Sequence, residues 1–245
     1  MHQALTYLPD EDFIFYADRK HVPYGEKTTG QIREYVDTAI AFMIREGAKA
    51  IVVACNTATS AAINEVRDKY PIPIIGMEPA VKKALDEDPD RRVLVVATPI
   101  TVRGEKLHDL IQKLDPRQMV DLIALPELVH FAEKGEFESD EIIRLLTDRF
   151  HSFDLSEYSS IVLGCTHFNY FKDNFRKVLP DQIRFIDGNK GTVNRLLDEL
   201  AAINGFEKNS QKVSYFYSGQ KVTEINELNC IRNYLERLDR MIEIT

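Results

Sequence analysis

The sequence predicts an α/β fold in two related halves, and three observations support this prediction. Short apolar runs alternate with helical patterns, which is the order expected of mainly parallel sheets with crossover helices. Two of the runs, residues 51–57 and 161–167, are near copies in which a cysteine follows the apolar stretch. After each copy come a helix, a proline and another apolar run. We therefore expect two pseudo-symmetric, doubly wound domains, with the active site in the cleft between them.

The expected strands are short, continuous and rich in β-branched residues, which is typical of strands buried on both faces of a parallel sheet. A doubly wound domain usually opens with a strand, but residues 1–8 resemble the end of a helix, so a strand is expected upstream of them. The predicted strands cover residues 12–17, 50–54, 72–77, 92–98, 119–125, 160–164, 183–186 and 213–217.

Capping residues mark the ends of the expected helices. Thr28 or Thr29 is a suitable N-cap for a helix that stops at Gly47. Ser139 precedes the helical pattern of residues 140–150, whose first turn is acidic and therefore suits the positive end of a helix.

The spacing of the repeat predicts where the domains divide. Cys55 and Cys165 lie 110 residues apart, which is roughly the size of one small domain. We predict a first domain of residues 1–78 plus 187–245 and a second of residues 79–186. Eight strands in a chain of this length also fit a (β/α)8 barrel, which is the alternative fold. The repeat favours two domains.

Composition narrows the class of protein. A net charge of −8 and a pI near 5.3 argue against non-specific binding to nucleic acid, which needs clustered Lys and Arg. The three cysteines form no Cys-x-x-Cys pair, so we expect reduced thiols and no metal site. The apolar runs are too short for a membrane span, and the first residues lack the pattern of a signal peptide. A cytoplasmic protein without membrane partners is expected.

Both strand-end cysteines are candidate catalytic residues. A free cysteine is often only a small buried side chain, so either one alone is weak evidence. Both, however, lie where a strand gives way to a helix, and a helix N-terminus favours a thiolate. Two such thiols that face one substrate would form an acid/base pair. The residues that follow them are polar and include donors for a carboxylate: Asn56, Thr57, Thr166 and His167.

Other candidates are less distinctive from the sequence alone. His167 can hold a proton that tunes Cys165. Asp18 is equally well interpreted as a solvated residue at the end of a strand. Glu133 is interpreted as an ordinary surface charge, and Cys230 as a packing residue. The sequence contains no glycine-rich phosphate loop and no lysine placed for a Schiff base. We therefore expect chemistry by side chains, without a cofactor.

Three motifs carry a family resemblance. They are Pro-Tyr-Gly at residues 23–25, Ala-Cys-Asn-Thr-Ala-Thr at 54–59 and Gly-Cys-Thr-His-Phe at 164–168. In this order and spacing they resemble the glutamate racemases of the bacterial aspartate/glutamate racemase superfamily, and the similarity runs through nearly the whole chain. The resemblance implies cofactor-independent inversion of glutamate at its α-carbon, supply of D-glutamate for peptidoglycan, and a homodimer.

The resemblance also implies roles for individual residues. Cys55 and Cys165 match the two catalytic thiols, each serving one face of the substrate. Asp18, Glu133 and His167 match positions that assist the thiols. The positions that match substrate-holding residues are Pro23, Tyr24, Gly25, Asn56, Thr57, Thr166 and His167.

The sequence departs from the family pattern at three places. Family members begin with a strand that ends in Asp-Ser-Gly, and this motif does not precede the first helix here. Arg19 stands where Thr is usual, and residues 169–170 are Asn-Tyr where Pro-Leu is common.

Three other functions fit parts of the pattern. One is an aspartate racemase or a related acid isomerase. Another is a small-molecule-binding homologue that is impaired in catalysis, which the absent Asp-Ser-Gly favours. A hydrolase with Cys165 as nucleophile and His167 as base is the third, and it leaves Cys55 without a role.

Overall fold

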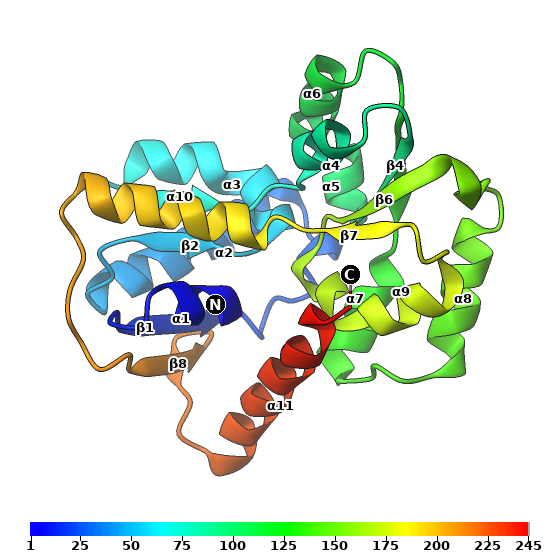
Figure 1. Cartoon of the computed structure of the whole chain (residues 1–245). Coiled ribbons are helices and arrows are strands. Elements are labelled where there is room, and N and C mark those ends of the chain that lie inside the picture. The colour runs from blue at the N-terminus through cyan, green and yellow to red at the C-terminus, as the bar shows by residue number, and fades with distance from the viewer. Residues whose placement is uncertain (245) are drawn as a thin grey trace. The chain divides into compact units, whose positions relative to one another are not determined.

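The computed structural model describes residues 1–244 and confirms the predicted α/β class with mainly parallel sheets (Figure 1). Each predicted strand is present within a few residues of its expected bounds. The strands are β1 (Phe13–Ala17), β2 (Ile51–Val53), β3 (Ile74–Gly76), β4 (Arg92–Ala97), β5 (Val120–Ala124), β6 (Tyr158–Leu163), β7 (Arg184–Ile186), β8 (Val213–Tyr217) and β9 (Gln220–Lys221).

Helices connect most of the strands, and short 3-10 segments are labelled η. They are α1 (His2–Tyr7), η1 (Tyr24–Glu26), α2 (Thr29–Arg45), α3 (Asn56–Lys69), α4 (Val81–Glu87), α5 (Pro99–Arg103), α6 (Glu105–Leu114), α7 (Pro126–Lys134), α8 (Asp140–Phe150), η2 (Leu155–Glu157), η3 (Thr166–Phe171), α9 (Lys172–Val178), α10 (Asn189–Ala202) and α11 (Ile225–Ile242).

The strands form three separate sheets, so the alternative of a single closed eight-stranded barrel is wrong. The sheet orders are β1-β8-β9, β2-β3 and β5-β4-β6-β7. All neighbouring strands are parallel except β8 and β9, which form an antiparallel hairpin. The strand β9 was not predicted, because two polar residues carry no strand pattern.

The chain divides into two compact units. The first contains Met1–Met77 and Asn189–Leu235, and the second contains Glu78–Gly188 and Glu236–Thr245. The two predicted boundaries, after residues 78 and 186, lie within two residues of unit boundaries in the structure, and the structure has a third boundary after Leu235. The prediction placed the end of the chain from residue 236 in the first domain, whereas the described residues 236–244 group with the second unit.

In the first unit, helices supply most of the buried core. Thr28 caps α2 in a capping box with Gln31: its side chain accepts from the Gln31 amide, and the Gln31 side chain accepts from the Thr28 amide. Of the two predicted caps, Thr28 is therefore the correct one. Gly47 follows the helix with φ of 92°, a left-handed conformation that glycine adopts without strain. The buried faces of α2 and α3 comprise Ile32, Val36, Ile40, Ala58, Ala61, Ala62, Ile63 and Val66.

The sheets of the two units differ in burial. All five residues of β1 are half-buried, whereas every residue of β6 in the second unit is buried. The strands β4 and β6 lie at the centre of a four-stranded sheet and have a partner on each side. Within residues 1–244, β1 pairs only with β8 and β2 pairs only with β3. Equally apolar strands are therefore less shielded in the first unit.

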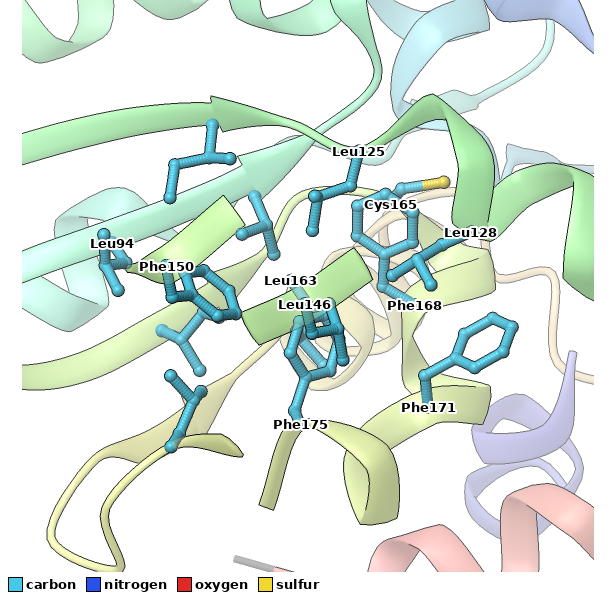
Figure 2. Packing of buried hydrophobic residues seen from close by; sticks show 14 of the residues in the cluster. Leu94, Leu125, Leu128, Leu146, Phe150, Leu163, Cys165, Phe168, Phe171 and Phe175 are labelled. Atoms are coloured by element: carbon cyan, nitrogen blue, oxygen red, sulfur yellow. The ribbon is translucent and has the colours of Figure 1, made fainter. Parts of the chain in front are cut away.

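Four phenylalanines form much of the core of the second unit (Figure 2). Phe168, Phe171 and Phe175 are fully buried together with Phe150. Phe168 and Phe171 lie in η3, where residues three apart point the same way, so both rings reach the core. Cys165 lies at the margin of this cluster and is 7% exposed.

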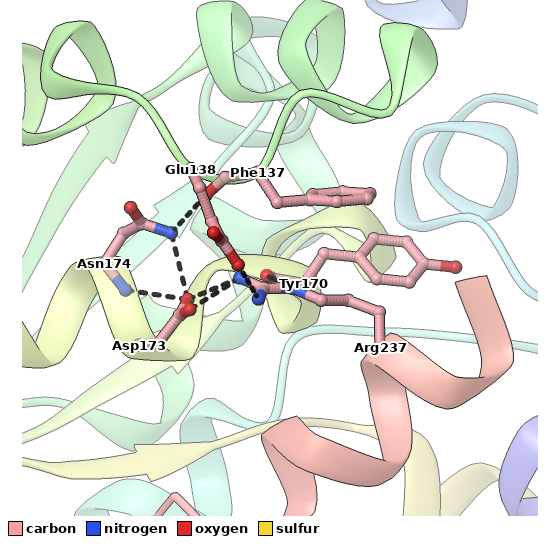
Figure 3. A network of polar contacts seen from close by, with 6 residues as sticks. All are labelled: Phe137, Glu138, Tyr170, Asp173, Asn174 and Arg237. Carbon is pink, nitrogen blue, oxygen red and sulfur yellow. Dashed lines mark hydrogen bonds and ion pairs between the residues drawn. The ribbon is translucent and has the colours of Figure 1, made fainter. Parts of the chain in front are cut away.

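Arg237 anchors the end of α11 in the second unit (Figure 3). Its side chain is 3% exposed and makes two 2.7 Å hydrogen bonds to the Asp173 carboxylate. Its Nε also donates to the Tyr170 carbonyl oxygen at 3.0 Å, and its guanidinium lies over the Phe137 ring. These contacts attach α11 from residue 236 onward to the second unit.

In residues 1–244, no helix combines the length and the apolar character that crossing a membrane requires.

We expect the substitution Arg237→Met to lower the free energy of unfolding by about 3 kcal/mol, because it leaves the Asp173 carboxylate without its buried partner. Arg117→Met is the matched control, since Arg117 forms an exposed ion pair with Asp90. The free energy of unfolding of this control variant should stay within about 0.5 kcal/mol of the wild-type value. Urea denaturation of both variants tests this, and equal losses would contradict it.

Candidate active site

Cys55 lies at the predicted junction between a strand and a helix. It follows β2 and is the N-cap residue of the 14-residue helix α3. Its Sγ accepts from the Ala58 amide at 3.4 Å, so the sulfur faces the N-terminal turn of the helix. Amide hydrogens and the helix dipole at this end favour negative charge on sulfur.

Asn56 and Thr57 are buried in the first turn of α3, with exposures of 5% and 3%. The Asn56 amide nitrogen donates to the Met77 carbonyl oxygen at 3.4 Å. Its Oδ1 is buried and has no hydrogen-bond partner within the described residues. A buried acceptor without a donor is costly, so this oxygen suits a donor brought by a ligand.

Close packing holds this turn in place. Thr59 donates through Oγ1 to the Val53 carbonyl oxygen and accepts from the Met77 amide, which joins β2, α3 and the end of β3. A Cβ on Gly76 would lie 2.6 Å from the Thr59 methyl group. Only glycine lets β3 approach α3 so closely.

Asp18 lies just after β1, and its side chain is 10% exposed. Its carboxylate accepts from the Tyr24 hydroxyl at 2.8 Å, from His21 Nδ1 at 2.8 Å and from the Ser218 hydroxyl at 2.9 Å. The predicted site residues Asp18 and Tyr24 are thus brought together by a direct bond. His21 and Ser218 were not predicted.

Tyr24 retains its proton in this setting. Burial raises the pKa of its hydroxyl, the bond to Asp18 raises it further, and negative charge on Cys55 adds to the effect. Tyr24 therefore stays a neutral phenol at physiological pH. Pro23 and Gly25 flank it at the start of η1 and are half-buried.

The second thiol, Cys165, follows β6 after one glycine and is the N-cap residue of η3. The predicted helix at this position is a six-residue 3-10 segment that continues into α9. A Cβ on Gly164 would lie 2.9 Å from the Val96 carbonyl oxygen, so glycine is needed where β4 and β6 end. Thr166, the next predicted residue, is half-buried.

His167 connects this thiol to a carboxylate. Its Nδ1 lies 3.7 Å from Cys165 Sγ, and its Nε2 lies 2.7 Å from Glu133 Oε1 at the end of α7. The residue pattern alone favoured ordinary surface charge for Glu133, but the structure gives it a specific partner. Cys165, His167 and Glu133 therefore form one polar chain.

His167 is protonated over a wide pH range. Burial alone disfavours the imidazolium, but the hydrogen bonds and negative charges of Cys165 and Glu133 outweigh it and raise the pKa of His167 to about 10.

Two threonine hydroxyls that were not predicted as site residues follow β4. Thr98 and Thr101 are 5% and 2% exposed, and their oxygens lie 3.2 Å apart. Because β4 and β6 are parallel neighbours, these hydroxyls lie at the same edge of the sheet as Cys165. Their only signal in the sequence is threonine just after a strand.

The predicted residues thus form two groups, one in each unit. In each group a thiol at a strand end is accompanied by polar side chains and a carboxylate. The first unit holds Asp18, Pro23, Tyr24, Gly25, Cys55, Asn56 and Thr57, and the second holds Glu133, Cys165, Thr166 and His167.

The fold and these groups define a class of α/β proteins built from two units, each with a thiol at the end of a parallel strand. Comparison with known proteins identifies the family. The chain belongs to the Asp/Glu/Hydantoin racemase family, whose model matches residues 4–196. The resemblance indicated by the three motifs is therefore confirmed.

Individual relatives match nearly the whole chain. It is 51% identical to the glutamate racemase of Campylobacter curvus over 250 residues, covering 100% of this chain and 94% of the relative. It is 44% identical to glutamate racemase 2 of Bacillus subtilis, covering 98% and 91%. The solved structure of the Thermus thermophilus glutamate racemase in complex with β-chloro-D-alanine has a TM-score of 0.74 at 25% identity, covering 96% and 86%.

We expect the free energy of unfolding to fall as pH rises from about 6.5, the ordinary pKa of histidine, to about 10, the pKa of His167 in the folded protein. Its raised pKa means that the imidazolium stabilises the folded state fully below this range and not above it. Urea denaturation across this range should show a smaller fall for His167→Asn.

The exposed His151 at the end of α8 provides a control, and His151→Asn should follow the wild-type pH dependence. Parallel curves for wild type and His167→Asn would contradict the assignment of this pH dependence to His167.

Proposed function

We propose that this chain interconverts L-glutamate and D-glutamate without a cofactor, as a glutamate racemase. The observation that carries the proposal is the matched placement of Cys55 and Cys165, each separated by one residue from the end of a parallel strand and beside polar side chains. Relatives named glutamate racemase, at 51% and 44% identity over nearly the full chain, support glutamate as the substrate.

The chemistry requires two groups that each act as base in one direction and as acid in the other. One thiolate removes the α-proton from one face of the substrate, and the other thiol returns a proton to the opposite face. A cysteine thiol has an ordinary pKa near 8.5, and a positive environment lowers it toward neutral pH. Cys55 and Cys165 take these two roles and exchange them when the reaction reverses.

His167 and Glu133 assist Cys165 in this proposal. The imidazolium stabilises the thiolate when Cys165 acts as base and resupplies the proton when it acts as acid. Glu133 orients the ring through Nε2, which leaves Nδ1 directed at the sulfur. Asp18 serves the other thiol through Tyr24, whose hydroxyl it holds.

The remaining residues bind the substrate. Asn56, Thr57 and Thr166 supply donors for its carboxylate, which stabilise the negative charge that develops when the α-proton leaves. The unpartnered Oδ1 of Asn56 accepts from the substrate ammonium group. Residues 23–25 complete the substrate contacts.

The biological role follows from the reaction. The D-glutamate formed supplies peptidoglycan synthesis in the cytoplasm. As part of the same proposal, the protein acts as a homodimer without nucleic-acid or membrane partners. No metal enters this mechanism, because side chains perform both proton transfers.

Racemisation in heavy water tests the reaction. We expect each turnover to place deuterium at the α-carbon of the newly formed enantiomer, because the returning proton comes from a thiol that exchanges with solvent. Mass spectrometry of the separated enantiomers measures this. Inversion without solvent label would contradict the two-thiol mechanism, and faster turnover of aspartate than of glutamate would contradict the proposed substrate.

Single-cysteine variants test the roles of the thiols. We expect Cys55→Ser and Cys165→Ser each to lower kcat by about 10³-fold, within the range for loss of a general acid or base. Each variant keeps one thiol, so the two should exchange the α-proton of opposite enantiomers. Cys230→Ser is the matched control, since Cys230 lies half-buried in α11, and its activity should equal wild type. Exchange of the same enantiomer by both variants would refute the assignment.

A further inference from the structure

The Asp18 carboxylate joins parts of the first unit that are far apart in the sequence. Ser218, 200 residues away, donates to its Oδ1, while His21 and Tyr24 donate to its Oδ2. Asp18 follows β1 and Ser218 follows β8, which are parallel neighbours. The sheet therefore brings these two side chains to the same edge.

The backbone at Ser218 shows that its hydroxyl has a specific use. Ser218 and Gly219 form the two-residue turn between β8 and β9, with φ of 45° and 86°. Two positive φ values mark a turn in which Asn or Gly is favoured at the first position. Serine is strained there, by roughly 1–3 kcal/mol, so its side chain must contribute something that glycine would not.

The hydroxyl of Ser218 makes two bonds that Gly lacks. It accepts from the Lys20 amide at 3.1 Å and donates to Asp18 at 2.9 Å. The Ser218 amide also donates to the Ala17 carbonyl oxygen at 2.8 Å. The turn is thereby attached to the start of the segment that leads to Tyr24.

His21 supports the same carboxylate from the other side. Its ring stacks on Tyr35 of α2, with centroids 3.7 Å apart and planes 9° apart. This packing fixes the ring while Nδ1 lies within 2.9 Å of both oxygens of Asp18. Ser218 and His21 together set the direction in which Asp18 meets the Tyr24 hydroxyl.

We propose that Ser218 and His21 are positioning residues for the segment of residues 23–25, and that they act through Asp18. This inference rests on the proposed function, in which that segment contacts glutamate. A fixed carboxylate holds Tyr24 and orders the segment before substrate arrives, which lowers the entropy lost on binding. Loss of the Ser218 hydroxyl therefore weakens substrate binding more than it slows proton transfer.

Substitutions at Ser218 distinguish the effect of the lost hydroxyl from the effect of the backbone conformation. Ser218→Gly removes the hydroxyl and relieves the strained φ, so the hairpin still folds. Ser218→Asn suits the same backbone and keeps a donor and an acceptor. We expect the glycine variant to raise KM for both glutamate enantiomers about tenfold, with a smaller change in kcat. The asparagine variant should restore most of the lost affinity.

Hydrogen exchange gives a readout that needs no activity. The amides of His21, Glu26 and Lys27 bond within this segment, and they should exchange faster in Ser218→Gly and recover in Ser218→Asn. His21→Phe, which keeps the stacking but loses the donor, should resemble Ser218→Gly. Asn204→Gly is the control, because Asn204 is exposed, has φ of 49° and follows α10; it should leave exchange and KM unchanged.

These experiments test the inference separately from the proposed function. If the wild-type protein does not racemise glutamate, the proposed function is wrong, while hydrogen exchange still shows whether Ser218 orders the segment. Wild-type exchange and KM in Ser218→Gly, or an asparagine variant as impaired as the glycine variant, would overturn the positioning role.

Discussion

The candidate site depends on one constraint: each thiol is held where a parallel strand ends and the chain turns into the next helix. Neighbouring elements approach these two junctions closely, because a Cβ on Gly76 would meet Thr59 of α3 and a Cβ on Gly164 would meet the Val96 carbonyl oxygen. Gly164 directly precedes Cys165, whereas Gly76 lies in β3, the strand next to β2, and packs against the helix that Cys55 caps. Cys55 and Cys165 are therefore positioned by the main chain, and the side chains around them supply the chemistry.

The two thiols have different electrostatic surroundings. Cys55 faces the first turn of a 14-residue α-helix and lies near a phenol that stays neutral. Cys165 precedes only a six-residue 3-10 segment, and its positive neighbour is the His167 imidazolium. A helix dipole keeps its sign at every pH, whereas an imidazolium loses its charge when it titrates. The two halves of the repeat thus reach similar chemistry by different physical means.

In both units a carboxylate holds a ring side chain of the candidate site. Glu133 fixes a histidine and Asp18 fixes a tyrosine. The Asp18 group extends further, because His21 and Ser218 also hold it. A carboxylate that accepts several hydrogen bonds is itself immobile, so it can orient the group that meets the substrate. The hairpin near the end of the chain thus bonds to the segment that leads to Tyr24.

The sequence by itself determined the α/β class, the strand-end positions of Cys55 and Cys165 and the start of α2 at Thr28 or Thr29. These features follow from local patterns of burial, capping and chain direction, which neighbouring residues carry. Only the tertiary structure decided the partners of Glu133 and Asp18, the bonds of Ser218, the choice of Thr28 as the cap and the packing of residues 236–244 in the second unit. Most of these contacts join residues far apart in the sequence, such as Glu133 with His167 (34 positions), Tyr170 with Arg237 (67) and Asp18 with Ser218 (200), and they depend on which elements pack together.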